Sequence, residues 1–305
     1  MKTKESSYNY GLNIFFNPKE VPEPSAVFAL PEVIGAVHMT PLPEGDGVLV
    51  HIPKADYEDT VRIRLNGSCR IVIAVEAGTT VTLLEEGRAG SLSIDLDVAA
   101  GADVRYIALR SGGVEFARRR AAVATDAKLA WTTAHIGAKF AYGRTSTRLT
   151  GRGSSVRERA MYLGADGDCF DLHSEVVHEA DASVSDLLTR GALAGRSKAI
   201  VRGLVRIPEG TRACIGKQKE DTLLLGPDAE VDAVPMLEIG TDDVRCGHSA
   251  STSQLDDESL FYLMSRGLDR RAAGQAVVEG FFAPVLEDCG EAFRASLGLK
   301  IARIV

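Results

Sequence analysis

The sequence lacks the cysteine pattern of a disulfide-stabilised domain. Its 305 residues include five cysteines, an odd number, and no two of them form a CxxC pair. They lie far apart in the chain, at Cys69, Cys169, Cys214, Cys246 and Cys289. Because disulfide frameworks normally use an even number of cysteines in a short secreted chain, this distribution predicts reduced thiols and a cytoplasmic protein.

Long apolar runs, excess basic charge and aromatic side chains are also scarce. The stretch 1–16, MKTKESSYNYGLNIFF, is broken by polar residues, which predicts neither a signal peptide nor a membrane span. The net charge of −7 argues against nucleic acid as the main partner. No P-loop motif is present, so we expect no ATP to bind to this chain. Aromatics make up 6% of the residues, with Trp131 the single tryptophan, and this argues against a sugar-binding groove.

Short segments of alternating apolar and polar residues are abundant from about Gly47 onward. Examples are GVLVHIP, VRIRL, RIVIAVEA, TVTLLEE and LSIDLDV, each of which ends near a Gly, Asp or Asn. Alternation with a period of two, together with many Val and Ile residues, predicts one β-strand after another. Helical spacing first appears within the last fifty residues or so.

A phrase recurs at the start of these segments: a small or turn residue, one or two polar residues, then an apolar residue. Five copies place the apolar residue at Val81, Val104, Leu129, Val156 and Val184, roughly 23 to 28 residues apart. Later copies, at Ile200, Ile215 and Val231, follow at spacings of roughly 14 to 18 residues. Such a period is typical of a solenoid, whose coils bury their apolar sides only by stacking. Periodicity alone also allows a β-sandwich.

The pattern changes to helical after Leu255. The stretch DDESLFYLMSRGL predicts a helix that is capped by Asp256 or Asp257 and ends at Gly267. A second helix is expected to start at Leu268-Asp269 and to stop at Pro284. The segment EAFRASLGLKIARIV predicts a third, shorter helix.

Several phrases in the C-terminal half resemble the SufB/SufD family, the scaffold subunits of the SUF iron–sulfur cluster assembly system. They are GLVRI, LLLG, PMLEIGTDDVRCGH, LFYLMSRGL and AVVEGFF, and the resemblance runs from about Gly45 to Phe282. It implies a mainly β fold, a right-handed parallel β-helix with a C-terminal α-helical tail that binds the ABC-type ATPase SufC. The expected organisation is an irregular lead-in with one short helix at 1–45, a β-helix core at 46–255 and a SufC-docking helical region at 256–305.

Within that family, the chain looks SufD-like. SufD proteins carry Cys-x-His followed by Gly and a small residue after an Asp-Asp pair, where SufB usually carries Glu-His-Glu. Here the segment is DDVRCGHS, with Cys246 and His248. Glu220 stands near the place of a SufB cysteine proposed for cluster assembly, and Cys214 is an open candidate to replace it. SufD proteins usually have a longer N-terminal helical region, so a small homodimeric SufB-like scaffold that works with SufC alone remains an alternative.

Cys246 and His248 lie two residues apart, so on a strand their side chains share one face. Thiolate and imidazole both suit iron, as free ion or in a transient iron–sulfur cluster. Two ligands are too few, which predicts that others come from a partner chain, with Glu220 and Cys214 as further candidates. In the alternative without a metal role, Cys246 is a small buried hydrophobic residue and the motif is structural.

The function expected is therefore a non-catalytic scaffold that pairs with SufB or with a second copy of itself. The expected SufC-docking residues are Leu260, Phe261, Tyr262 and Arg266, although an apolar stripe on a helix is often part of a core. Two alternatives remain at this point. One is a SufD-like homologue that binds SufC without a cluster role, and the other is a stand-alone carbohydrate-active enzyme on a β-helix.

Overall fold

The computed structural model describes residues 31–43, 46–88, 90–287 and 289–304. The short helix expected in the lead-in, at the AVFAL stretch 26–30, lies outside the described residues. Residues 32–34 and 38–41 of the same lead-in form two short strands. Among the described residues, no helix is long and apolar enough to cross a membrane.

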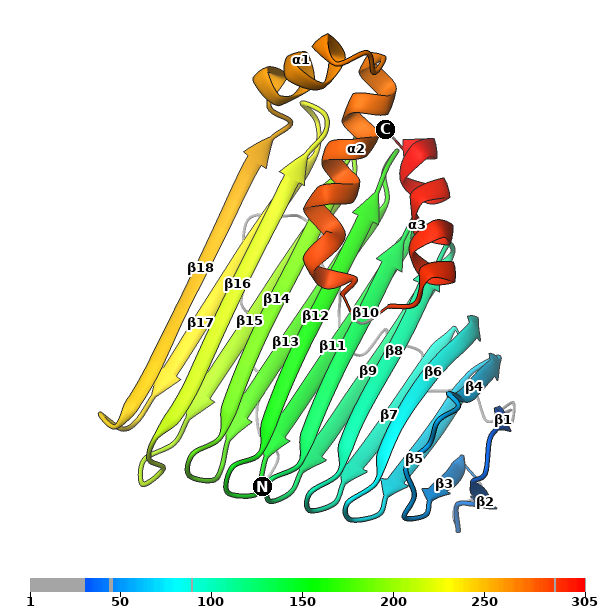
Figure 1. Cartoon of the computed structure of the whole chain (residues 1–305), viewed down its shortest axis with the longest axis vertical. Helices are drawn as coiled ribbons and strands as arrows, with labels where there is room; N and C mark the ends of the chain where they lie inside the picture. Colours follow the sequence, from blue (N-terminus) through cyan, green and yellow to red (C-terminus); the bar gives the residue numbers. More distant parts are fainter. Residues whose placement is uncertain (1–30, 44–45, 89, 288, 305) are drawn as a thin grey trace.

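The chain alternates between two nine-stranded sheets, so that each coil adds one strand to each sheet (Figure 1). The first sheet contains, in order, β1 (Glu32–Ile34), β4 (Val61–Asn66), β6 (Thr80–Arg88), β8 (Asp103–Ser111), β10 (Lys128–Ile136), β12 (Ser155–Gly164), β14 (Val184–Leu193), β16 (Cys214–Leu224) and β18 (Val244–Gln254). The second contains β2 (His38–Pro41), β3 (Val48–Ile52), β5 (Cys69–Val75), β7 (Ser91–Val98), β9 (Val114–Val123), β11 (Phe140–Leu149), β13 (Cys169–His178), β15 (Lys198–Ile207) and β17 (Glu230–Ile239). The strands pair in parallel, except that β1 and β2 pair antiparallel to their neighbours. The prediction of a mainly β solenoid is confirmed.

Alternation along each strand decides which side chains fill the interior. In β5, for example, Ile71 and Ile73 are fully buried, whereas Val72 between them is only half-buried. The inward positions of successive strands lie in register. In the other sheet, for example, Val81 on β6, Val104 on β8 and Leu129 on β10 are direct cross-strand neighbours. Each coil buries its apolar side against the next coil, as expected for a solenoid.

The recurring phrase is in register only for its first four copies. Val156 follows Leu129 in the stack, but its neighbour on β14 is Ser185 rather than Val184. The first buried residue of β14 is accordingly Ser185, and Val184 is half-buried. The later copies open β15, β16 and β17 in turn, so their shorter spacing counts strands of both sheets and not shorter coils. The copies look alike because every strand of either sheet begins after a similar turn.

Three helices follow the last strand: α1 (Asp257–Ser265), α2 (Arg270–Phe282) and α3 (Glu291–Ile304). Asp256 caps α1, because its carboxylate accepts from the backbone N–H groups of Glu258 and Ser259. Asp269 caps α2 in the same way, and a 3₁₀ turn containing Pro284 ends it. The prediction of a shorter third helix is wrong: α3 has 14 residues, against 9 in α1 and 13 in α2.

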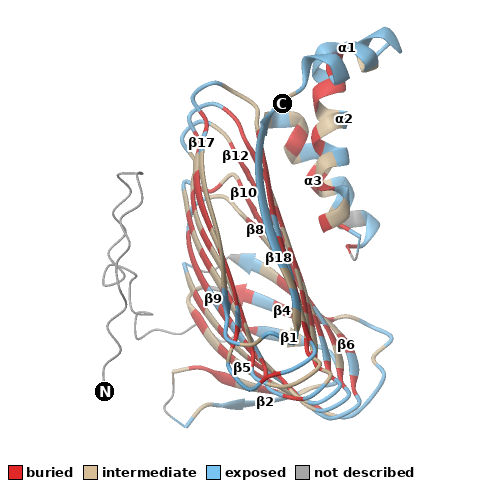
Figure 2. Ribbon diagram, turned by 90° about the vertical axis from the view of Figure 1, so that its left-hand side faces the viewer, coloured by how far each residue is buried: buried red, intermediate tan, exposed pale blue. Residues whose placement is uncertain are grey.

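The helices α2 and α3 pack on the outer side of the sheet that contains β8 to β16 (Figures 1 and 2). A second apolar cluster holds them there. Its strand residues are Ile107, Ala134, Ile136, Met161, Leu163, Ala192 and Leu223, and its helix residues include Val278, Phe282, Leu297 and Ile301. Burial of these side chains keeps the tail on the solenoid, since each fully buried Leu or Ile contributes roughly 1.5–3 kcal/mol.

Candidate functional site

The Cys-x-His motif lies on β18, the last strand of its sheet (Figure 1). In the register with β16, Cys246 lies beside Gly216 and His248 beside Gln218. Gln218 is buried in the interior, whereas Lys217 and Lys219 point outward and are exposed. Cys246 and His248 therefore share the interior face of the solenoid at its open end.

The two side chains differ in exposure. Cys246 is half-buried and packs against the main apolar core, and a Cβ atom built on Gly216 would lie 3.1 Å from its Sγ. Burial raises the pKa of the Cys246 thiol, so a metal that binds there must displace a proton. His248 is exposed at the open end of the solenoid, where a partner can reach it.

Glu220 lies on the same interior face as Gln218. The Gln218 amide donates to Glu220 Oε1 over 2.8 Å, while Glu220 Oε2 and Gln218 Oε1 have no hydrogen-bond partner. Burial raises the pKa of Glu220 to about 7. Gly203 on the opposite sheet leaves room for this pair, since a Cβ there would come within 2.0 Å of the Gln218 amide nitrogen. An acid with an unsatisfied oxygen thus lies one strand from His248.

Cys214 is placed differently from the other three candidates. It is fully buried, and its Sγ lies 3.4 Å from Ser183 Oγ and 3.5 Å from the carbonyl oxygen of Arg212. Its cross-strand neighbour is Val244, and Cys246 lies two residues farther along β18 on the same face. Over the described parts of the chain, no three His, Cys, Asp or Glu residues are grouped so as to hold a metal ion.

Three of the four residues that sequence analysis assigned to docking are exposed: Phe261 and Tyr262 on α1, and Arg266 at its C-terminal end. Phe261 is 72% and Tyr262 56% exposed, and the Arg266 guanidinium lies 5.2 Å from the centre of the Tyr262 ring. Leu260 is buried and so belongs to the packing of the tail. The helix α1, which carries Phe261 and Tyr262, lies beyond the ends of the strands (Figures 1 and 2).

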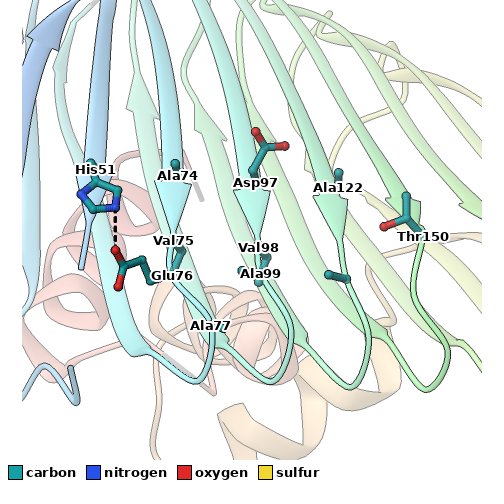
Figure 3. A pocket seen from close by; sticks show the side chains of 11 residues that line it. His51, Ala74, Val75, Glu76, Ala77, Asp97, Val98, Ala99, Ala122 and Thr150 are labelled. Atoms are coloured by element: carbon teal, nitrogen blue, oxygen red, sulfur yellow. Dashed lines mark ion pairs between the residues drawn. The ribbon is translucent and has the colours of Figure 1, made fainter. Parts of the chain in front are cut away.

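A large surface groove lies at the other end of the molecule (Figure 3). It has a volume of about 470 Å³, and its lining is rich in alanine at the ends of β5 and β9 and in the turns that follow β5, β7 and β9. Its titratable lining groups are Asp97 and the pair His51 and Glu76, whose ring Nε2 and carboxylate oxygen are 3.0 Å apart. These groups do not resemble a metal or catalytic set, so volume alone does not make this groove the functional site.

Sequence analysis missed a chain of charged side chains inside the solenoid. Glu85 accepts hydrogen bonds from Arg119 and from the Tyr106 hydroxyl, and its Oε1 also lies 2.7 Å from Arg110. Farther along, Glu158 is buried with an unpartnered Oε2. A signal was present, because Glu85 stands in the inward phase of the alternation that Val81 and Leu83 begin.

Comparison with known proteins gives one consistent result. A family model described as the SufBD core domain of SUF-system iron–sulfur cluster assembly matches residues 64–281. SufD of Escherichia coli K12 is 30% identical over 195 residues, which cover 63% of this chain and 46% of that protein. SufD of Bacillus subtilis 168 is 30% identical over 181 residues, or 59% and 41% of the two chains.

A longer SufBD family protein of Mycobacterium leprae is 28% identical over 214 residues, 69% of this chain and 25% of that protein. The matched segments thus span less than half the length of each of these relatives. The family model, however, extends from β4 to the last turn of α2 and so takes in both the solenoid and the start of the tail. This chain belongs to the SufBD family of the SUF iron–sulfur cluster assembly system.

Proposed function

We propose that this protein is a non-catalytic scaffold whose metal site is completed by a partner chain at β18. The observation that carries the proposal is the position of Cys246 and His248 on the interior face of a sheet edge. Two ligands do not hold iron or a cluster, and Glu220, whose carboxylate is an oxygen donor, is a third candidate ligand on the neighbouring strand. A partner strand beside β18 would bring its own side chains to the same face.

The edge of β18 is suited to such pairing. The strand has 11 residues, contains no proline and is the terminal strand of its sheet. An unpaired edge of this length presents a row of N–H and C=O groups to another strand. The neighbouring edge strand, β17, carries Pro235 in its middle, and proline interrupts such a row. We therefore place the second chain, SufB or another copy of this protein, along β18.

Replacing His248 by alanine tests the metal role. We expect anaerobic reconstitution with iron and sulfide to yield at least about tenfold less cluster per complex, since loss of even an outer-shell partner costs 10–100-fold in metal affinity. The measurement is iron and acid-labile sulfide per mole of complex. Ser249→Ala, on the outward face of the same strand, is the matched control and should leave the cluster content unchanged. Full cluster content in H248A would mean that this chain has only a structural role.

The partner is identified by the mass of the complex. We expect native mass spectrometry with SufC to show two β-helix chains per assembly, and addition of SufB distinguishes a mixed pair from a pair of identical chains. A complex that contains only one β-helix chain under all conditions would contradict the proposal of a shared site.

We further propose that SufC docks on α1 through Phe261 and Tyr262. Their combined replacement by alanine should weaken SufC binding by roughly 100-fold, because exposed aromatic anchors commonly contribute about 2 kcal/mol or more. Calorimetric titration of SufC measures the affinity. The control is Leu299→Ala on α3, since Leu299 is as exposed, at 71%, but lies on another helix. Unchanged affinity in the double variant would exclude α1 as the docking site.

A further inference from the structure

A chain of polar contacts crosses the outer face of the sheet from β18 to α2. Ser251 on β18 donates to Asp221 Oδ1 on β16 over 2.7 Å. Asp221 Oδ2 lies 3.7 Å from Arg190 Nε on β14. The Arg190 guanidinium donates in turn to the backbone carbonyl of Phe281 and lies 4.9 Å from the centre of the Phe281 ring. The three strand residues are direct cross-strand neighbours.

These polar contacts are partly shielded from water. Asp221 is buried, and the Arg190 side chain is 17% exposed beneath α2. An ion pair in such a setting is screened less than one on an open surface. Lys219 adds a second cation, with its Nζ 3.0 Å from Asp221 Oδ2. Asp221 is therefore held between two cations on one side and the Ser251 hydroxyl on the other.

The apolar packing of the tail takes another route. The cluster that holds α2 and α3 includes Leu223 on β16, and Leu255 beyond the end of β18 packs against it. Among the residues described, no side chain of β18 itself belongs to that cluster. The polar contacts thus connect α2 with the strand that carries His248 by a route that the apolar cluster does not use.

We propose that Arg190 and Asp221 are positioning residues that couple α2 to β18. When α2 shifts, Arg190 loses its carbonyl acceptor and its ring contact, and Asp221 then loses one of the groups that hold it against Ser251. The role of this coupling in the assembly rests on the proposed function. There, a partner bound to the tail would change the order of β18 at Ser251, three residues from His248. The coupling itself needs no partner, because Ser251, Asp221, Arg190 and Phe281 all belong to this protein.

Hydrogen–deuterium exchange of the full chain, without any partner, tests the coupling. In R190M we expect the β18 amides that are bonded to β16 to exchange roughly three- to tenfold faster, together with those of α2. Lys217→Met is the matched control, since it removes a cation from the outward face of β16 without touching this chain of contacts. Faster exchange in α2 alone, or equal acceleration in β5 and β7 at the far end, would overturn the proposal.

A double-mutant comparison separates coupling from a merely structural effect. D221N alone should accelerate β18 in the same way, and R190M/D221N should exchange in β18 no faster than the more affected single variant, because both break one connection. Additive acceleration would contradict the coupling. Since no SufC is present, this result does not depend on whether the Phe261 and Tyr262 experiment succeeds. With SufC added, R190M should retain binding but lose any SufC-induced change in β18 exchange, and a retained change would also overturn the inference.

Discussion

Glu85→Gln is expected to lower the free energy of unfolding at pH 7 by roughly 3–5 kcal/mol, the usual effect of removing one partner from a buried ion pair. The reason is that Arg119 is fully buried and its hydrogen bonds, at 2.8 to 3.2 Å, all go to the Glu85 carboxylate. The isosteric amide leaves that guanidinium charged inside the solenoid without the carboxylate that accepts its hydrogen bonds, and only the more remote charge of Glu115 remains. Urea denaturation followed by circular dichroism measures the change.

The pH dependence of this variant follows from the Glu85 pKa. Burial alone would raise it, but the charges of Arg110 and Arg119 outweigh burial and hold the pKa at about 2. A depressed pKa contributes stability above the unfolded-state value of 4.5, and this contribution is lost as the pH falls toward 2. The difference between wild type and E85Q should therefore shrink below pH 4.5.

The neighbouring residue provides the control. Glu86 points outward and pairs with Arg62 over 2.7 Å at the surface, with both side chains a third or more exposed. Glu86→Gln should change the free energy of unfolding by no more than about 1 kcal/mol. If E85Q and E86Q were equally mild, the interior ion network would contribute little to stability.

Glu158→Gln should raise the free energy of unfolding at alkaline pH, whereas Glu85→Gln lowers it. Burial between its cross-strand neighbours Trp131 and Leu187 raises the pKa of Glu158 to about 7 from 4.5. This burial outweighs the Ser174 hydroxyl and the Arg119 charge, which lower the pKa. A raised carboxyl pKa means that the native state binds the extra proton between pH 4.5 and 7. The free energy of unfolding therefore falls as the pH rises through this window, and the total loss, roughly 3 kcal/mol, is complete above pH 7. The amide cannot ionise, so E158Q avoids this loss.

The measurement compares the unfolding free energies of wild type and E158Q at pH 5 and pH 8. We expect the gain at pH 8 to be largely absent at pH 5. Glu115→Gln is the contrasting control: burial would raise the pKa of Glu115, but His135 and Arg110 outweigh it and lower the pKa. E115Q should accordingly destabilise the protein at both pH values. A wild type that is more stable than E158Q at pH 8 would show that Glu158 has a charge partner in solution.

Much of the architecture could be predicted because a solenoid repeats one local rule. Alternation in segments such as RIVIAVEA places every second residue inside, and this holds in β5. Helix capping is equally local, and Asp256, one of the two predicted candidates, caps α1. The spacing of the later repeats was misread because the starts of strands in the two sheets look alike in sequence. Only the register shows that Ser185, and not Val184, continues the interior stack.

The candidate site divides in the same way. Sequence spacing predicts that Cys246 and His248 share a face, because a strand has a period of two. It does not predict that Cys214, on the same interior face one coil earlier, is fully buried while Cys246 is half-buried. That difference depends on which coil is the last one, since a final coil has no neighbour to cover it. The helical pattern likewise did not separate buried Leu260 from exposed Phe261.

The succession of strands and the helical tail could be predicted from the sequence, because they depend on residue patterns within short segments. The solenoid was expected from the family resemblance, since periodicity left a β-sandwich open. Only the tertiary structure shows the pairing of Glu85 with Arg119, the burial of Glu158, and the contacts from Ser251 through Asp221 and Arg190 to α2. The physical reason is that these contacts join residues from different coils. Their partners and their distance from water are set by how the coils stack.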